Sequence, residues 1–217
     1  LCILTRHQFR IRVRPLTDDI SRDPTIGAVI IGRNEGARLV ACLASFPASV
    51  KPLVYVDSGS TDGSVAAARA AGAEVVALDM SVPFTAARAR NEGLAVLAEH
   101  GAPDFVQFVD GDCVLQPGWL PAARAFLVAN PEAAVVCGRR REIHPEASVW
   151  NRLCDAEWDT PVGRAKACGG DALMRRAHRI EVGGAPVFAV RRCDDRLVVA
   201  DRQVDARRVV RHQRTLG

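Results

Sequence analysis

The 217-residue chain is long enough for one α/β domain with a complete core, or for one domain and a small appendage. Its apolar residues (48%) and charged residues (25%) occur in the ordinary proportions of a soluble globular protein. The net charge of +4 arises in the C-terminal region, where eleven arginines lie between Arg175 and Arg214, and aromatic residues make up only 5% of the chain. A basic, aromatic surface that binds nucleic acid is therefore not indicated.

Seven cysteines are scattered along the chain without a Cys-x-x-Cys pair, so their spacing indicates neither a zinc site nor a disulfide framework. Free thiols in a reducing compartment fit this pattern. No apolar run reaches the length of a membrane span, and the start of the chain lacks a hydrophobic signal core. We therefore expect a cytoplasmic protein without a transmembrane segment. Peripheral contact with the inner face of a membrane is compatible with the sequence.

The predicted elements begin after a leader over residues 1–24, in which Pro15 and Pro24 interrupt two short apolar stretches. Helices and strands then alternate, with Gly72 and Gly101 placed to end the second and third helices. The expected strands cover residues 28–31, 53–56, 74–78, 105–109 and 134–137, and the expected helices follow residues 35, 61, 85 and 117. This alternation predicts βαβ units, and hence an α/β fold with a mainly parallel central sheet flanked by helices.

Three of the predicted strands end in small, polar or acidic residues, at positions 32–35, 57–60 and 110–112. In an open parallel sheet, ligands bind beyond the carboxyl ends of the strands. We therefore expect the three segments to meet at one ligand-binding edge of the sheet.

The loop after the second strand, residues 57–63, places turn-forming residues and small hydroxyls between a strand and a helix. Its backbone can approach a ligand closely, and Asp57 can accept hydrogen bonds from a base or a ribose. Alternatively, its Asp and Ser side chains only satisfy the amides of the next helix. The spacing by itself favours neither interpretation.

Asp110 and Asp112 are two carboxylates on either side of Gly111, directly after a mostly apolar strand. The glycine lets the backbone bend, so both acids can face one point. Together with a diphosphate they would form an oxygen shell for Mg²⁺ or Mn²⁺. An Asp-Gly turn at a strand end is the structural alternative, but the neighbouring Asp57 loop favours the metal site.

Further candidates lie on the third helix and in later loops. Arg88, Arg90 and Asn91 lie at the start of this helix. An arginine there could reach a pyrimidine edge or a phosphate, or it could lie on a solvated helix face, which is the expectation for Arg88. The Gly-Gly-Asp loop at residues 169–171 would suit a sugar or an acceptor hydroxyl, and its alternative is a turn before a final helix. His144 is expected at the surface.

Over roughly residues 26–184 these segments together resemble family 2 glycosyltransferases, which are inverting enzymes with the Rossmann-like GT-A fold. The matching stretches occur in the family's order, at residues 29–35, 56–63, 89–93, 108–112 and 169–175. The resemblance implies transfer of a sugar from a UDP-, GDP- or dTDP-sugar to a saccharide or lipid-linked acceptor, in polysaccharide or glycoconjugate biosynthesis. It also implies a Mn²⁺ or Mg²⁺ cofactor that neutralises the departing diphosphate.

The resemblance further assigns roles to individual residues. Asp110 and Asp112 would hold the metal, with Asp112 as the direct ligand. The donor nucleotide would be bound by Arg33, Asn34, Glu35, Asp57, Ser58, Gly59, Arg90 and Asp110. The segment 150–159 would lie over the donor or the acceptor, and the acceptor side would include Trp158, Asp159, Gly169 and Gly170. The candidates for the catalytic group are Asp171, Asp194 and Asp195.

After about residue 178 the chain departs from the family pattern, in which an acidic pair beyond the Gly-Gly-Asp loop supplies the base. Asp194 and Asp195 lie at the approximate distance, but within Arg-Arg-Cys-Asp-Asp-Arg. A shifted reading frame or a truncated end would explain the change. The sequence thus divides into the leader, a GT-A domain over residues 25–184 and an Arg/Val-rich tail over residues 185–217.

Two alternatives to an active glycosyltransferase follow from the same residues. The first is a nucleotide-sugar-binding remnant that lacks the usual base. The second is a nucleotidyltransferase, which would need a glycine-rich phosphate loop after the first strand. Residues 32–35 are too short for such a loop.

Overall fold

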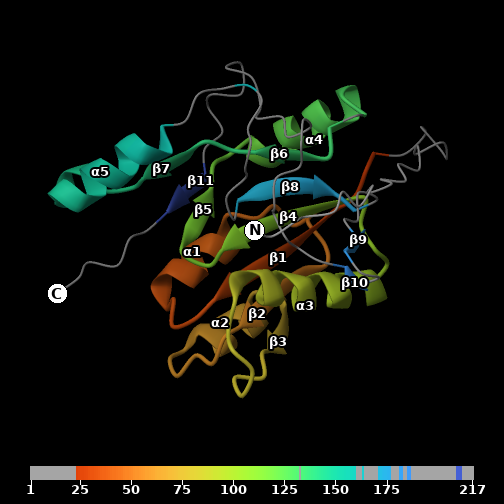
Figure 1. Cartoon of the computed structure of the whole chain (residues 1–217), viewed down its shortest axis with the longest axis horizontal. Coiled ribbons are helices and arrows are strands. Elements are labelled where there is room, and N and C mark those ends of the chain that lie inside the picture. Colours follow the sequence, from red (N-terminus) through yellow and green to blue (C-terminus); the bar gives the residue numbers. More distant parts are fainter. Residues whose placement is uncertain are drawn as a thin grey trace, which may run out of the picture.

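A six-stranded sheet with the order β3-β2-β1-β4-β8-β6 forms the centre of the molecule (Figure 1). The computed structural model describes residues 23–131, 133–159, 163 and 171–176, and the backbone of three short strands at 181–182, 185–186 and 209–211. The sheet strands are β1 (Ile26–Gly32), β2 (Leu53–Asp57), β3 (Glu74–Ala77), β4 (Phe105–Asp110), β6 (Val135–Cys137) and β8 (Ala172–Arg175).

The other elements surround this sheet. A second sheet contains β5 (Cys113–Leu115), β11 (Val209–Arg211) and β7 (Arg140–Glu142), and β9 (Glu181–Val182) pairs with β10 (Ala185–Pro186). The helices are α1 (Ala37–Ala44), α2 (Ser64–Ala70), α3 (Ala86–Glu99), α4 (Trp119–Ala129), α5 (Val149–Trp158) and the 3₁₀-helix η1 (Pro145–Ala147). No helix in the part of the chain that the structure describes is both long and apolar enough to cross a membrane.

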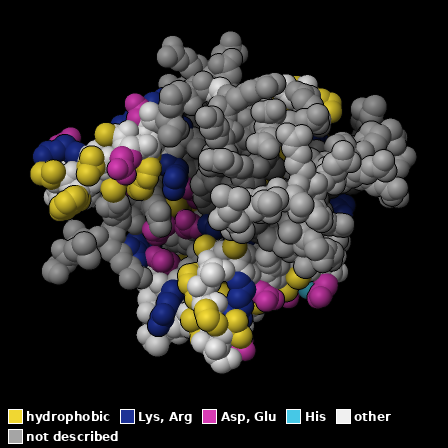
Figure 2. Space-filling model, viewed as in Figure 1, with side chains coloured by type: hydrophobic (Ala, Val, Ile, Leu, Met, Phe, Trp, Pro, Cys, Tyr) yellow, Lys and Arg dark blue, Asp and Glu magenta, His cyan; other side chains and the backbone are white. Residues whose placement is uncertain are grey.

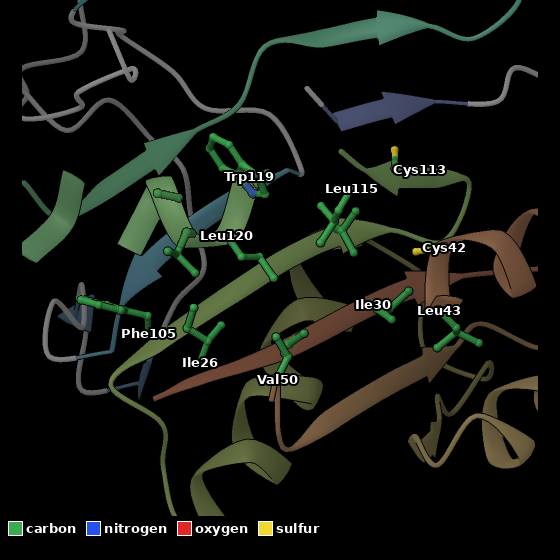
Figure 3. Close-up of a cluster of buried hydrophobic side chains, with 14 of the residues drawn as sticks. Ile26, Ile30, Cys42, Leu43, Val50, Phe105, Cys113, Leu115, Trp119 and Leu120 are labelled. Carbon is green, nitrogen blue, oxygen red and sulfur yellow. The ribbon is translucent and has the colours of Figure 1, made fainter. Parts of the chain in front are cut away.

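Strands β3, β2, β1 and β4 run parallel, which confirms the predicted α/β class and its mainly parallel sheet. The apolar run in β1 is buried along its whole length until Gly32. Such runs are expected where helices cover both faces of a sheet. One face is covered by α1 and α4 (Figure 3), and the other by α3.

Strand β8 runs antiparallel to both of its neighbours, β4 and β6. It occupies the place of the final helix that was one interpretation of the residues after Asp171, and that interpretation was wrong. Because Ala172 is paired with Phe108, the amino end of β8 reaches the edge where β4 ends. Asp171 is thereby carried to the same edge as Asp110.

Helix α3 lies unusually close to the sheet at Gly93. A Cβ atom at this position would lie 2.5 Å from Cγ1 of Val29 and 2.9 Å from Cγ2 of Val56. Any larger side chain would push the helix away from β1 and β2. The glycine therefore sets the distance at which the first turn of α3 approaches the carboxyl edge of the sheet.

Helix boundaries follow local capping. Thr85 accepts a hydrogen bond from the Arg88 amide and caps α3, and Gly101 with φ of 96° follows its end, as expected. Helix α2 begins at Ser64, later than expected, because the preceding residues form a turn in which Asp62 accepts from the Ser64 amide. The three-residue strands β5 and β7 were not predicted, because they are too short to carry a periodic pattern.

Candidate functional site

The carboxyl ends of β1, β2 and β4 lie side by side at one edge of the sheet. Gly32 is in register with Asp57, and Ile31 is in register with Asp110. The three segments that were expected to meet at a ligand-binding edge are therefore neighbours in space.

The loops after β1 and β2 are joined by hydrogen bonds through Asn34. Its amide donates to Oγ of Ser60 (2.9 Å), and its Oδ1 accepts from the Thr61 amide (2.8 Å). Asn34 has a φ of 54°, in the left-handed region that asparagine tolerates better than most residues. The amides of Glu35 and Gly36 both donate to Oγ of Ser64, at 3.1 Å each. The two loops form one connected backbone surface.

Asp57 is a buried carboxylate, 4% exposed, that organises its own loop. Its Oδ2 accepts from the amides of Gly59 (3.0 Å) and Ser60 (2.9 Å), and its Oδ1 accepts from the Tyr55 hydroxyl (3.2 Å). The acid that serves the next helix is Asp62 rather than Asp57. Asp57 therefore holds a preformed loop at the ligand-binding edge.

Tyr55 is buried beneath this loop. Burial, together with the negative charges of Asp57 and Glu35, raises the pKa of the Tyr55 phenol well above its usual value. The neutral phenol is thus the form that supports Asp57.

High pH is expected to ionise Tyr55 only when the protein unfolds. The pKa of Tyr55 is higher in the folded protein than in the unfolded chain, where it is about 10. The neutral phenol therefore contributes fully to the free energy of unfolding below about pH 10, and this contribution is lost as the pH rises further. Tyr55 is the only tyrosine in the chain, so its ultraviolet phenolate absorbance can be followed directly beside circular dichroism. Phenolate formation near pH 10 in a still folded protein would contradict the expectation. The Tyr55→Phe variant should show no such signal, and its free energy of unfolding should fall less steeply with pH above about 10.

Asp110 forms an ion pair with Arg90 on α3, with 2.7 Å between Oδ1 and the guanidinium. Both side chains are largely buried, at 20% and 16% exposed. Within the described residues, Nε of Arg90 and Oγ of Ser58 are buried without a hydrogen-bond partner. Buried polar atoms of this kind normally have a partner, so both are available to a bound ligand.

The turn at Gly111 is packed closely against the end of β1. Its amide donates to the Ile31 carbonyl (2.8 Å), and an added Cβ would lie 3.3 Å from both the Ile31 oxygen and Cγ of Glu35. Asp110 and Asp112 flank this turn. Among the residues that the structure describes, no group of three or more His, Cys, Asp or Glu side chains could hold a metal. A cation at this turn would therefore need further oxygen ligands, such as those of a diphosphate.

Negative charge is concentrated around the buried thiol of Cys42. Burial raises the pKa of this thiol, and the charges of Asp171, Asp112, Asp110 and Glu35 raise it further. Four carboxylates from three separate segments therefore lie near this thiol. Three of them pair with arginines: Glu35 with Arg38, Asp110 with Arg90, and Asp171 with Arg140.

Asp171 and Trp158 are connected through Arg140, which was not among the predicted residues. Asp171 is almost fully buried, and its Oδ2 lies 3.7 Å from Nε of Arg140. The guanidinium of Arg140 in turn lies 5.3 Å from the centre of the Trp158 ring, within the range of a cation–π contact. Asp159 forms an ion pair with Arg139. No sequence motif singled out Arg140, because its partners lie on α5 and next to β8.

The segment expected to lie over the ligand is largely helix α5. Its Asp155 accepts from Nε of Arg141 (2.6 Å) and from the Glu142 amide (2.9 Å), which fixes the helix to β7. The helix leaves Val149, Trp150 and Leu153 exposed. Acidic and basic side chains are visible in Figure 2 between this helix and the lower part of the molecule.

Gly169, Gly170, Asp194 and Asp195 fall outside the described residues. Arg33 is exposed beside the Asn34 loop, and Gly59 has a φ of 82° with Met80 packed next to it. His144 is exposed, as expected.

Arg88 lies on a partly exposed face of α3. Its guanidinium donates to the carbonyl oxygens of Asp79 (2.9 Å) and Val82 (3.1 Å) in exposed hydrogen bonds, which join α3 to the loop that precedes it. The sequence does not reveal this role, because backbone carbonyls carry no sequence signal.

A mainly parallel sheet with an Asp-Gly-Asp turn after β4 and an antiparallel β8 beside it is the GT-A fold. The chain belongs to glycosyl transferase family 2, whose family model matches residues 28–194.

Solved structures with this fold include glucosyl-3-phosphoglycerate synthase from Mycobacterium tuberculosis. One structure of that enzyme is 20% identical and has a TM-score of 0.55, covering 89% of this chain and 74% of that one. Another, in complex with Mn²⁺, UDP-glucose and glycerol 3-phosphate, is 23% identical with a TM-score of 0.50, covering 70% of this chain. This chain spans only 57% of the length of that structure. No curated protein matches the sequence.

Proposed function

We propose that this domain transfers a sugar, with inversion, from a UDP-, GDP- or dTDP-sugar to a saccharide or lipid-linked acceptor, using Mn²⁺ or Mg²⁺. The observation that carries the proposal is the meeting of the Asp57 loop, the Arg90–Asp110 pair and Asp112 at one edge of the sheet. The Mycobacterium tuberculosis synthase, which holds Mn²⁺ and UDP-glucose on the same fold, supports a metal and a nucleotide-sugar donor.

The donor would lie across the joined loops after β1 and β2. Asp57 offers its carboxylate to the base or the ribose, beside Arg33, Asn34, Glu35 and Gly59. The Ser58 hydroxyl and Nε of Arg90, which have no partner among the described residues, would donate to ribose or phosphate oxygens.

Asp112 would be the direct metal ligand. Asp110 already binds Arg90 through Oδ1 and is therefore better placed to orient that guanidinium. A bound Mn²⁺ or Mg²⁺ would supply Lewis-acid stabilisation of the diphosphate. The remaining oxygen ligands of the ion would come from the diphosphate itself.

The acceptor would approach on the side of Trp158 and Asp159. An aromatic ring next to a charged pair, here Trp158 beside Arg140 and Asp171, combines an apolar face with hydrogen-bonding groups, as saccharides require. In the reaction, the acceptor oxygen bonds to the anomeric carbon as the bond to the diphosphate breaks, and a carboxylate takes the acceptor proton. Asp171 is the candidate base among the described residues, beside Asp194 and Asp195 outside them.

We further propose that the protein takes part in polysaccharide or glycoconjugate biosynthesis. It would act in the cytoplasm, in contact with the inner face of a membrane. The membership of glycosyl transferase family 2 supports the biosynthetic role. A second candidate function, nucleotide-sugar binding without transfer, is favoured by one observation. The acidic pair at Asp194 and Asp195 lies in an arginine-rich context that differs from the family pattern.

A melting-temperature panel of nucleotides with Mn²⁺ or with EDTA tests the donor half. UDP, GDP or dTDP is expected to stabilise the protein with Mn²⁺ by about 2.7 kcal/mol at a hundredfold excess over Kd, and to stabilise it less in EDTA. Failure of all three diphosphates to raise the melting temperature with Mn²⁺ would contradict the proposal. Donor hydrolysis or transfer then separates the two candidate functions, because only the transferase releases the diphosphate.

A further inference from the structure

Two buried free thiols flank the Asp110–Asp112 turn. The thiol of Cys42, on α1, lies 3.8 Å from the Asp110 carbonyl oxygen. The thiol of Cys113, the first residue of β5, donates to Oδ1 of Asp112 at 3.4 Å. Both cysteines are fully buried, and they lie at the same end of the core (Figure 3). The turn is thus held by one thiol at its backbone and by another at its second carboxylate.

We propose that Cys113 is a positioning residue for the cation, which it serves by fixing the carboxylate of Asp112. The proposal rests on the proposed function, because it takes Asp112 as the metal ligand. By engaging Oδ1, the thiol would fix the orientation of the Asp112 carboxylate relative to the ion. Asp112 follows a glycine and is only partly buried, so this contact limits the orientations that its side chain adopts.

Core packing and strand pairing restrict the movement of the Cys113 sulfur. The residue belongs to the main core cluster, and β5 is paired with β11. A thiol is a weak donor in water, but a hydrogen bond is stronger in a buried environment. Mutation of a group that hydrogen-bonds to a metal ligand typically lowers metal affinity ten- to a hundredfold. For a thiol we expect the lower end of this effect.

Cys113 and Cys42 are both without exposed surface, but they differ in what they contact. Cys113 donates to the carboxylate of Asp112. Cys42 contacts the backbone carbonyl of Asp110. It therefore helps to position the backbone of the Asp110–Asp112 turn rather than a carboxylate. Cys137, on β6, is another buried free cysteine, which makes it a matched control.

The test compares UDP affinity in Mn²⁺ and in EDTA by titration calorimetry for the full chain. The ratio of the two dissociation constants measures the contribution of the metal. Cys113→Ala and Cys113→Val both lack the donor, and the valine also fills the space. Both are expected to reduce the ratio by about three- to tenfold, with the EDTA value unchanged. Cys113→Ser keeps a donor and is expected to restore most of the ratio, and Cys137→Ala should match the wild type.

Each contrary outcome has a distinct meaning. If neither donor-lacking variant changes the ratio, Cys113 does not position Asp112. If UDP binding weakens equally in Mn²⁺ and EDTA, or if serine does no better than valine, Cys113 acts through packing alone. If wild-type protein binds UDP equally well with and without Mn²⁺, the proposed metal site itself fails. Should the alanine variant not fold, the valine and serine pair decides the question.

Discussion

Asp112→Asn is expected to remove the Mn²⁺-dependent part of UDP affinity and to lower sugar transfer by about a hundredfold or more. The amide keeps the shape of the side chain but loses the charge that faces the cation. A metal that stabilises a departing diphosphate contributes several kcal/mol, and about 3 kcal/mol corresponds to about a hundredfold in rate. UDP titrations in Mn²⁺ and EDTA measure the first effect, and initial rates with the nucleotide-sugar donor measure the second.

Asp23→Asn is the control for this change. Asp23 is 84% exposed and pairs with Arg124, so its loss should leave both measurements unchanged. Asp110→Asn should differ from both variants, because it releases Arg90 as well as removing a carboxylate. An Asp112→Asn variant that retains the Mn²⁺ effect would show that the cation, if it binds, is held elsewhere.

Arg175→Met is expected to destabilise the protein by about 3–5 kcal/mol, because it leaves several buried backbone carbonyls without their hydrogen-bond donor. Nε of Arg175 donates to the Ala133 carbonyl (2.9 Å), and a terminal nitrogen donates to the carbonyls of Leu127 and Asn130. Its guanidinium also lies 5.3 Å from the centre of the Phe105 ring. Methionine fills part of the space but leaves the carbonyls at the end of α4 without this donor, and each such loss costs about 1–3 kcal/mol.

The adjacent Arg176 supplies the matched control. It is exposed, and its side chain donates to the Pro103 carbonyl at 2.9 Å. Arg176→Met should therefore cost no more than about 1 kcal/mol. Urea unfolding of both variants beside the wild type measures the difference. Equal losses for the two variants would refute the central role of Arg175.

Local patterns in the sequence were sufficient to predict the parallel part of the central sheet. The apolar runs of β1, β2 and β4 can only be buried between two layers of helices, and capping by Thr85 is a local event. The direction of β8 could not be predicted in this way. Four residues are too few for a periodic pattern, and the direction of the strand depends on pairing with residues more than sixty positions away.

The same distinction applies to the candidate site. The sequence indicated which loops would carry ligand-binding residues, since strand ends are read locally. The sequence did not indicate which arginines pair with the acidic residues of the site. The pairing of Arg90 with Asp110 depends on how closely α3 approaches the sheet at Gly93, and that of Arg140 with Asp171 depends on the placement of β7.

The direction of β8 has a consequence for how this protein can diversify. The loops proposed for the donor follow strands β1, β2 and β4 and are joined to one another by hydrogen bonds. The residues proposed for the acceptor all belong to a single stretch of chain between β6 and β8, which leaves the central sheet after Cys137 and rejoins it at Ala172. On the proposed function, this stretch can therefore change as one continuous segment. Its replacement in a relative would direct the sugar to another acceptor, while the loops after β1, β2 and β4 that bind the nucleotide stay the same.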